Sequence, residues 1–509
     1  MEFEQGPGAK QTAFRHDSSS SSEEDEKFKA AGVASAPGPT SLQPPIPFDE
    51  QGKRVSPNDE LFRLEFVMPQ YLRMAMAAAV ESKLLDPLGS DAPAPSKAPK
   101  APLYPLIVMI NSKSGGRKGP ALRAVLNHLL SKEQVFDLSI TPPKDFFRYG
   151  LGCLERLAEL GDQCAKDVRN RLRLIVAGGD GTVGWVLGSM TELHVEHRMP
   201  IPPVGIIPLG TGNDLSRSFG WGGSFMFSCR PFVRRYLRKA SSGQTAELDS
   251  WQVMVRTSST EKVQLPHALH PQQHIPLFEE PLHGQDIEVF LVIWTLPKVV
   301  FLLIELDFIT GMDAQVAYGF HNLREKKPYL AQGPISNKVV YSGCSCVQGW
   351  FCTPCSANPR VRALRNIMQM EVKREPNGDW EPVDLPQNVR AVIMLNLQSY
   401  ASGRNPWGHP NEEYNQRKRF VQPRPDDGIL EIFGLFDGWH ASLVMLSLRS
   451  AKRLAQACAI RMHLIADLRH RIYMQMDGEP WRQPLSENEN STIIEITPTP
   501  TRSLMLKAS

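Results

Sequence analysis

Residues 172–183 read LRLIVAGGDGTV, and this stretch decides the fold. Its first six residues are mostly apolar, as expected of a short buried strand in a parallel sheet. The Gly-Gly-Asp-Gly turn that follows leads into helix-like residues 183–190. Glycines at such a turn leave backbone N–H groups open to a phosphate, and the helix dipole favours the same anion. The stretch therefore predicts an α/β domain with a phosphate-binding loop, in which Asp180 suits Mg²⁺ or a water network.

Two further apolar strands end in loops of the same kind. The strand at 106–110 runs into NSKSGGRK at 111–118, and the strand at 204–207 runs into PLGTGNDLSR at 208–217. The spacing of the first loop is not that of a P-loop. Because parallel strands end at one edge of a sheet, where open α/β folds bind ligands, we expect the three loops to form one nucleotide site. Helix-like stretches separate the strands, at 119–131 and 151–169.

Composition and the pattern of apolar residues divide the chain into parts. At 509 residues it exceeds one ordinary core, so we expect two folded domains. Serine, acidic and proline-rich stretches predict a mostly disordered tail at 1–100, where only 61–85 is apolar enough to fold. The α/β domain is expected at 101–235, a β-rich accessory domain that completes the active site at 236–490, and a C-terminal strand and tail at 491–509. The strands expected in the second domain and after it lie around Val253 and at 337–341, 368–373, 391–397, 429–436 and 492–497.

Composition argues against some classes of protein. Charged residues make up 22% of the chain and the formal net charge is +3, which is too small a positive field for a dedicated nucleic-acid binder. Eight cysteines are few for this length, and no basic-then-apolar signal opens the chain, so we expect a reducing, cytoplasmic setting. One group of cysteines lacks the spacing of a zinc site and is expected to be unpaired thiols: Cys344, Cys346, Cys352 and Cys355.

Two apolar segments raise the question of membrane contact. The run at 289–309 contains Pro297, Lys298, Glu305 and Asp307, which are costly in hydrocarbon, so we do not expect a transmembrane helix. Residues 440–470 predict a helix with a basic face. Such a helix suits the core of a domain, a membrane surface or a calmodulin-like partner.

Together the three loops resemble the catalytic domain of the diacylglycerol kinases. Downstream, GMDA at 311–314, DDG at 426–428 and QMDGEPW at 475–481 resemble the accessory domain of these enzymes. The resemblance spans about residues 104–485 and is closest to short plant-type members without cysteine-rich C1 domains. It implies transfer of a phosphoryl group from ATP, with Mg²⁺, to diacylglycerol, which yields phosphatidic acid in lipid signalling. It also implies a cytoplasmic enzyme attached peripherally to the membrane.

The resemblance further implies roles for individual residues. Asp477 is expected to be the base for the lipid hydroxyl, with Glu479 in support, and Asp180, Asp214 and Asp249 are expected to form the network around the catalytic Mg²⁺. From the residues alone, an exposed aspartate at a strand start is nearly as good a reading of Asp249, and a solvated helix arginine is an equal alternative for Arg217. Asp426 and Asp427 are expected to hold a structural Mg²⁺ or to form a turn. The residues expected to bind ATP are Asn111, Ser114, Gly115, Gly178, Gly179, Asp180, Gly181, Thr182, Gly210, Thr211, Asn213 and Arg217.

Residues 291–309 depart from the pattern of the family. A short aromatic strand usually precedes GMDA, whereas this chain carries an apolar run that we expect to leave an exposed patch. This departure keeps open a catalytically inactive membrane adaptor. The shared Gly-Gly-Asp-Gly loop also keeps open another lipid kinase or an NAD kinase.

Overall fold

The computed structural model describes two domains. The described residues are 57–85, 99–114, 118–225, 229–256, 299–306, 318–320, 322–323, 326, 340, 343–344, 364–366, 368–464, 470–476, 479–483 and 492–508. Most of the expected tail at 1–100, the expected strand at 337–341 apart from Val340, and three of the four grouped cysteines lie outside them.

The first domain is built on a six-stranded sheet in the order β2-β1-β3-β4-β17-β5. Its first four strands are parallel, and β17 runs parallel to β4 but antiparallel to β5. Every residue of β1 and β4 is buried, as expected when helices cover both faces of a parallel sheet. The strands are β1 Leu106–Ile110, β2 Val135–Asp137, β3 Arg173–Gly178, β4 Val204–Pro208, β5 Thr245–Leu248 and β17 Ser503–Leu506. The predicted α/β class is therefore confirmed.

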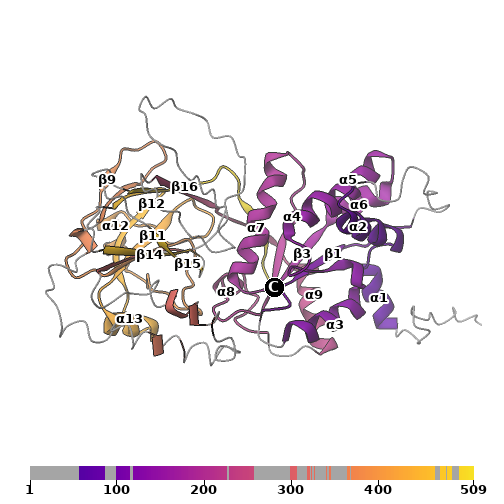
Figure 1. Cartoon of the computed structure of the whole chain (residues 1–509), viewed down its shortest axis with the longest axis horizontal. Helices are drawn as coiled ribbons and strands as arrows, with labels where there is room; N and C mark the ends of the chain where they lie inside the picture. Colours follow the sequence, from indigo (N-terminus) through magenta and orange to yellow (C-terminus); the bar gives the residue numbers. More distant parts are fainter. Residues whose placement is uncertain are drawn as a thin grey trace, which may run out of the picture. The chain divides into compact units, whose positions relative to one another are not determined.

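Helices flank this sheet (Figure 1). The expected helix at 151–169 is divided, because Gly161 adopts φ +97 and Asp162 then caps the next helix by accepting from Ala165 N at 3.0 Å. The apolar part of the expected tail forms two helices whose Phe66 and Leu72 are fully buried in the core of this domain. The helices are α1 Pro57–Phe66, α2 Gln70–Ser82, α3 Lys118–Leu130, α4 Pro143–Asp145, α5 Gly152–Glu159, α6 Gln163–Arg171, α7 Asp180–Val195, α8 Asp214–Ser218 and α9 Arg230–Ser242, with η1 Lys132–Gln134 and η2 Phe146–Leu151.

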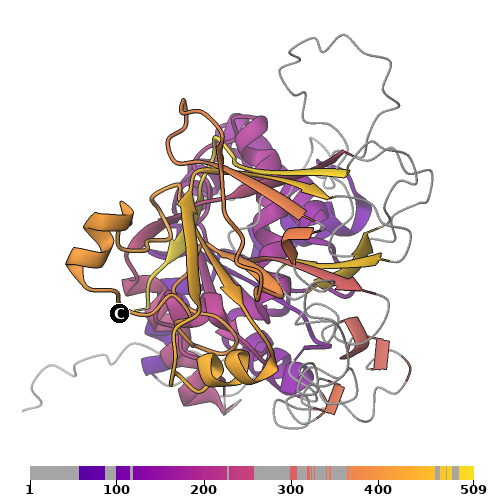
Figure 2. The same cartoon turned by 90° about the vertical axis from the view of Figure 1, so that its left-hand side faces the viewer.

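The second domain consists of two largely antiparallel sheets, whose orange and yellow strands face the viewer in Figure 2. Val392 of one sheet and Met462 of the other belong to the same buried cluster, so the sheets pack face to face. One sheet contains β12 Lys452–Ala457, β11 Leu430–Leu435, β10 Ala391–Leu395, β7 Val299–Leu306, β14 His470–Met476 and β15 Glu479–Gln483. The other contains β6 Trp251–Arg256, β16 Thr492–Pro498, β13 Ala459–Leu464, β8 Met368–Lys373 and β9 Glu381–Pro382. The remaining elements are α12 Glu412–Lys418, α13 Gly438–Met445 and η6 Leu364–Asn366.

One of the two expectations about apolar segments was wrong. The helix predicted at 440–470 ends at Met445, and β12, β13 and β14 follow, because alternate residues such as Ala455 and Met462 are buried between the two sheets. The run at 289–309 includes β7, which pairs with β10 on one side and β14 on the other. The exposed patch expected there stays a prediction, because the side chains of this run are not among those that the structure describes. No helix among the described residues is long and apolar enough to cross a membrane.

The expected strand and tail at 491–509 are instead two strands in two domains. β16 pairs with β13 and β6, whereas β17 returns to the first domain between β4 and β5. Trp221 Nε1 donates to Leu506 O at 2.6 Å, a contact between residues 285 positions apart. The sheet of the first domain thus draws on strands outside the expected 101–235.

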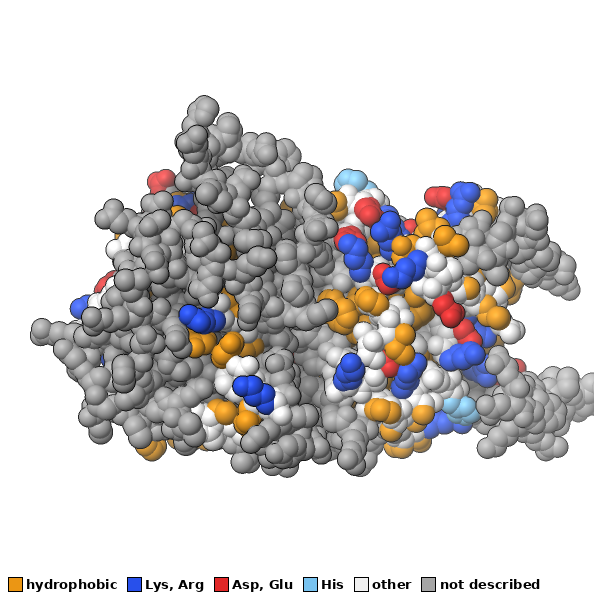
Figure 3. Space-filling view, viewed as in Figure 1, with side chains coloured by type: hydrophobic (Ala, Val, Ile, Leu, Met, Phe, Trp, Pro, Cys, Tyr) orange, Lys and Arg blue, Asp and Glu red, His pale blue; other side chains and the backbone are white. Residues whose placement is uncertain are grey.

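Charge is mixed on the surface of the first domain. On the face drawn in Figure 3, the basic and acidic side chains described there are interspersed. This agrees with the formal net charge of +3 for the chain.

Candidate active site

The loops that follow β1, β3 and β4 meet at the carboxyl edge of the parallel sheet. Asn111 Nδ2 donates to Thr182 Oγ1 at 3.2 Å, which joins the first loop to the second. A Cβ on Gly210 would lie 2.6 Å from the Cα of Gly179, so the second and third loops approach closely enough to require glycine. These three loops therefore form one continuous surface, as predicted from the sequence.

The N-terminus of α7 lies on this surface. The helix begins at Asp180 with Gly179 as its N-cap, and no side chain caps it. Gly181 of its first turn is half-buried and has no side chain, so part of its backbone is exposed to solvent. The first N–H groups of a helix lack intrahelical partners and attract anions, which makes this end suitable for a phosphate.

Asp180 and Asp214 connect the loops to one another and to the second domain. The Asp180 carboxylate accepts from the backbone N–H of Asp214 at 2.9 Å and of Leu215 at 3.1 Å, at the start of α8. The Asp214 carboxylate accepts from Ser399 Oγ at 2.6 Å, Ser402 N at 3.1 Å and Gly403 N at 2.8 Å. Residues 399–403 follow β10, so Asp214 attaches the nucleotide loops to the second domain.

Other residues predicted to bind ATP make contacts within or between the loops. The side chain of Asn213, only 1% exposed, bonds to the backbone of Gly210 and Gly223, and its φ of +55 turns the chain. Thr211 O accepts from Ser402 Oγ at 3.3 Å. Arg217 is exposed and donates from Nε to Gly212 O at 3.3 Å.

The first loop is described only in part. Ser114 N donates to Asn111 O at 3.0 Å, which forms the turn after β1. Gly115 lies outside the described residues.

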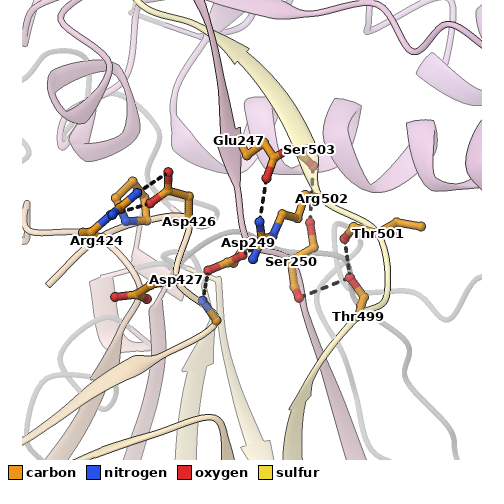
Figure 4. A network of polar contacts seen from close by, with 12 residues as sticks. Glu247, Asp249, Ser250, Arg424, Asp426, Asp427, Thr499, Thr501, Arg502 and Ser503 are labelled. Atoms are coloured by element: carbon orange, nitrogen blue, oxygen red, sulfur yellow. Dashed lines mark hydrogen bonds and ion pairs between the residues drawn. The ribbon is translucent and has the colours of Figure 1, made fainter. Parts of the chain in front are cut away.

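Asp249 lies in a second polar network, at the passage from β5 to β6 (Figure 4). It is 3% exposed, so the reading as an exposed aspartate was wrong. One carboxylate oxygen pairs with Arg502 Nε at 2.8 Å and the other accepts from Gly428 N at 2.5 Å. Burial raises the pKa of Asp249, while Gly428 and Arg502 act to lower it. Arg502 also pairs with Glu247 at 2.6 Å, so one guanidinium holds two acids.

Further carboxylates surround Asp249. Burial, together with the charges of Asp249 and Asp426, raises the pKa of Asp427 to about 6. Asp426 pairs with Arg424 at 2.9 Å, and this hydrogen bond lowers its pKa. Glu431 on β11 is 1% exposed, and burial raises its pKa well above the usual value. Sequence reasoning missed Glu431, although an acid within the apolar strand LEIFGL was a visible signal.

The contacts of Asp249 thus join it to Gly428, next to Asp427, whereas Asp180 contacts Asp214. Within the described ranges, no three His, Cys, Asp or Glu side chains converge as a metal-binding group.

The residues described on either side of 477–478 are the paired ends of β14 and β15. Asp477 and the side chain of Glu479 are outside the described residues. Met476, the last residue of β14, pairs with Val300, and Val299 pairs with Leu395 at the end of β10. The described residues on either side of 477–478 thus lie at the same end of this sheet as the carboxyl end of β10. Residues 399–403, which follow β10, contact Asp214.

Comparison with known proteins agrees with this architecture. Residues 105–245 match the diacylglycerol kinase catalytic domain, and residues 308–480 match the diacylglycerol kinase accessory domain. "Diacylglycerol kinase 3" of Arabidopsis thaliana is 50% identical over 452 residues, which cover 87% of this chain and 90% of that protein. "Diacylglycerol kinase 7" of the same plant is 48% identical over 449 residues, 88% of this chain and 90% of the relative. The chain belongs to the diacylglycerol kinase family.

Proposed function

We propose that this chain transfers the terminal phosphoryl group of ATP to the free hydroxyl of 1,2-diacylglycerol, which yields phosphatidic acid. The observation that carries the proposal is the meeting of three glycine-rich loops at the N-terminus of α7, beside Asp180 and Asp214. Phosphoryl transfer depends mainly on positioning and on electrostatic stabilisation of the phosphates. The glycine backbone, the N-terminus of α7 and the polar side chains of the loops supply both the positioning and the electrostatic stabilisation.

In this proposal, the backbone N–H groups at the start of α7 bind the phosphates of ATP, and Asn111 and Thr182 fix the distance between two loops. Asp477 accepts the proton of the lipid hydroxyl while the hydroxyl oxygen bonds to the terminal phosphorus and ADP leaves. Glu479 supports Asp477. The contacts of Asp214 with residues 399–403 hold the second domain, which carries the base, against the nucleotide loops.

Two sets of carboxylates fit Mg²⁺. A Cβ on Gly212 would lie 3.1 Å from Asp214 Oδ2 and 3.3 Å from Asp180 Oδ2, so both oxygens border the space beside this glycine. A carboxylate oxygen has about two lone pairs, so Asp214 Oδ2, which accepts one N–H bond, retains a lone pair for a hard cation. Mg²⁺ bound there would neutralise phosphate charge during transfer.

We infer that Asp426 and Asp427 hold a second, structural Mg²⁺ in the second domain. Glu431 Oε2 is buried without a hydrogen-bond partner in the described part of the chain, and burial beside other acids raises the pKa of Asp427. A divalent cation would relieve this concentration of buried negative charge. Added Mg²⁺ should therefore raise the melting temperature of purified protein, and Asp427→Asn should remove that increase. A melting temperature independent of Mg²⁺ would contradict the second site.

The activity is tested with purified protein and labelled ATP. We expect label in phosphatidic acid when a dispersed short-chain diacylglycerol is the acceptor, and little label with a sphingoid base or NAD. Label mainly in one of the latter would favour the other kinases that share the Gly-Gly-Asp-Gly loop. No label in any acceptor, at native fold, would favour an inactive membrane adaptor.

We also propose that the enzyme acts in the cytoplasm and binds the membrane peripherally, because the two acyl chains of diacylglycerol keep it in the bilayer. A calmodulin-like partner is not proposed. That expectation rested on a helix across 440–470, of which only α13 exists.

A further inference from the structure

The short helix α13 presents apolar side chains on two sides. His440, Ala441 and Val444 are buried, with the last two in the cluster that includes Phe433 and Leu435. Trp439 and Leu446 are each 62% exposed, and Leu448 in the following turn is 69% exposed. Residues 439, 443 and 446 recur at helical spacing, so Trp439, half-buried Leu443 and Leu446 share the outward face. We call Trp439, Leu443, Leu446 and Leu448 the α13 tip.

Single exposed apolar residues are ordinary on a protein surface. The α13 tip is different because its large side chains all fall within one short helix and the turn that follows. A helix that is apolar on all sides is expected to be covered on all sides. The outward face of α13 is therefore suited to a partner with an apolar layer.

Basic residues surround the α13 tip. Arg449, which follows Leu448 directly, and Lys452, four residues after Leu448, are both exposed. The same turn packs on residues 406–408, since Ala451 N donates to Pro406 O at 2.8 Å and Arg453 Nε donates to Trp407 O at 2.7 Å.

Arg453 extends this basic surface to α12. Its guanidinium lies 5.4 Å from the centre of the Tyr414 ring, and that of Arg417 lies 5.6 Å from the same ring. Lys418 and Arg419 are exposed beside Arg417. The acids described on these elements are Asp437, which caps α13, and Glu412 and Glu413 at the start of α12.

We propose that the α13 tip docks this enzyme on an anionic bilayer surface. Tryptophan and leucine side chains enter the boundary between headgroups and acyl chains, while arginine and lysine bind lipid phosphates. A second copy of the chain is a poorer partner, because it would bring two basic surfaces together. The proposal rests on the proposed function, which requires access to a diacylglycerol in the bilayer, and it names the surface that provides this access.

The docking surface is connected to the nucleotide loops by one stretch of chain. Residues 399–403 bond to Asp214, and Pro406 and Trp407 a few residues later contact the turn after α13. A bilayer bound at the α13 tip would thus be linked to the loops through residues 399–408. Phosphatidic acid, the anionic product, would strengthen the attachment.

Vesicle binding tests the proposal with the full chain. We compare sedimentation with phosphatidylcholine vesicles that contain or lack phosphatidic acid. Trp439→Ser/Leu446→Ser/Leu448→Ser should lower the partition coefficient about tenfold or more, since apolar burial supports interfacial binding. Arg449→Glu/Lys452→Glu should remove most of the preference for anionic vesicles. The matched control, Ile140→Ser/Leu160→Ser, removes apolar side chains that are 72% and 62% exposed in the first domain and should leave the partition coefficient unchanged.

The outcomes separate docking from catalysis. Unchanged melting temperature and unchanged activity on dispersed short-chain diacylglycerol establish that the triple variant is folded. Vesicle binding equal to wild type in that variant would overturn the proposal. A wild-type dimer that dissociates in the triple variant, with vesicle binding intact, would assign the α13 tip to a second copy and also overturn it. If the wild type lacks activity on the dispersed substrate, the proposed function fails while the vesicle comparison still decides the docking surface.

Discussion

Asp214→Asn tests whether the nucleotide loops are attached to the second domain through one carboxylate. In the native protein, Oδ1 accepts from Ser399 Oγ and Gly403 N, and Oδ2 accepts from Ser402 N. Asparagine has a single oxygen, so it can retain the first two bonds. The NH₂ group of its side chain must then face the N–H of Ser402, so that two hydrogen-bond donors oppose each other and this bond is lost.

The expected loss of local stability can be worked out from these contacts. A hydrogen bond to a charged group contributes about 1.5–3 kcal/mol, and Ser402 and Gly403 are partly solvated, which favours the lower half of that range. We therefore expect a loss of about 2 kcal/mol in the local stability of residues 399–403. At about 1.4 kcal/mol per factor of ten, this corresponds to roughly 30-fold more frequent opening.

Hydrogen exchange measured by mass spectrometry reports this opening directly. A peptide covering 399–408 should exchange roughly 30-fold faster in Asp214→Asn, while strands of the first domain keep their protection. Asp437→Asn is the matched control: it removes the same charge from the N-cap of α13, where Asp437 Oδ1 accepts from His440 N at 2.7 Å. Lost activity with unchanged exchange at 399–408 would refute the reasoning, since Asp214 would then act only on nucleotide or metal.

Four further substitutions test the site. Asp180→Asn should abolish turnover and also lower the free energy of unfolding by about 1–3 kcal/mol, because its carboxylate accepts two backbone N–H groups; an unchanged melting temperature would contradict this. Gly210→Ala should weaken a non-hydrolysable ATP analogue at least about tenfold in calorimetry, since the new methyl group would meet Gly179; native affinity would show that the loops can separate. Asp477→Asn should lower kcat by about 10²–10⁴-fold at unchanged affinity for the analogue, and Glu479→Gln should lower it less. Native kcat in Asp477→Asn would mean that another carboxylate is the base.

The first domain could be predicted from sequence because its signals are local. Each of β1, β3 and β4 is a short apolar run that ends at a glycine-containing loop, and the parallel topology alone brings the loops to one edge. β2 was missed because three residues carry no periodicity. The break between α5 and α6 was missed because Gly161 and Asp162 lie within an otherwise helical pattern.

The contacts between distant segments could not be predicted. Ser402 and Asp214 are 188 positions apart, and no local pattern identifies such partners. The same holds for the ion pair between Arg502 and Asp249, because nothing in the sequence around Arg502 indicates its partner. The helix expected at 440–470 shows the opposite error, because pairing with neighbouring strands overrides an amphipathic helical pattern.

The position of β17 has a consequence for biosynthesis. β17 lies between β4 and β5, although the whole second domain is translated between β5 and β17. Until residues 503–506 leave the ribosome, the edge of β4 is an open row of N–H and C=O groups in an otherwise complete parallel sheet. The nascent first domain would then depend on chaperones or on rapid synthesis to avoid pairing with other chains. A premature stop within the second domain would consequently leave the nucleotide-binding half unfinished as well, so such fragments should aggregate and not persist as free ATP-binding modules.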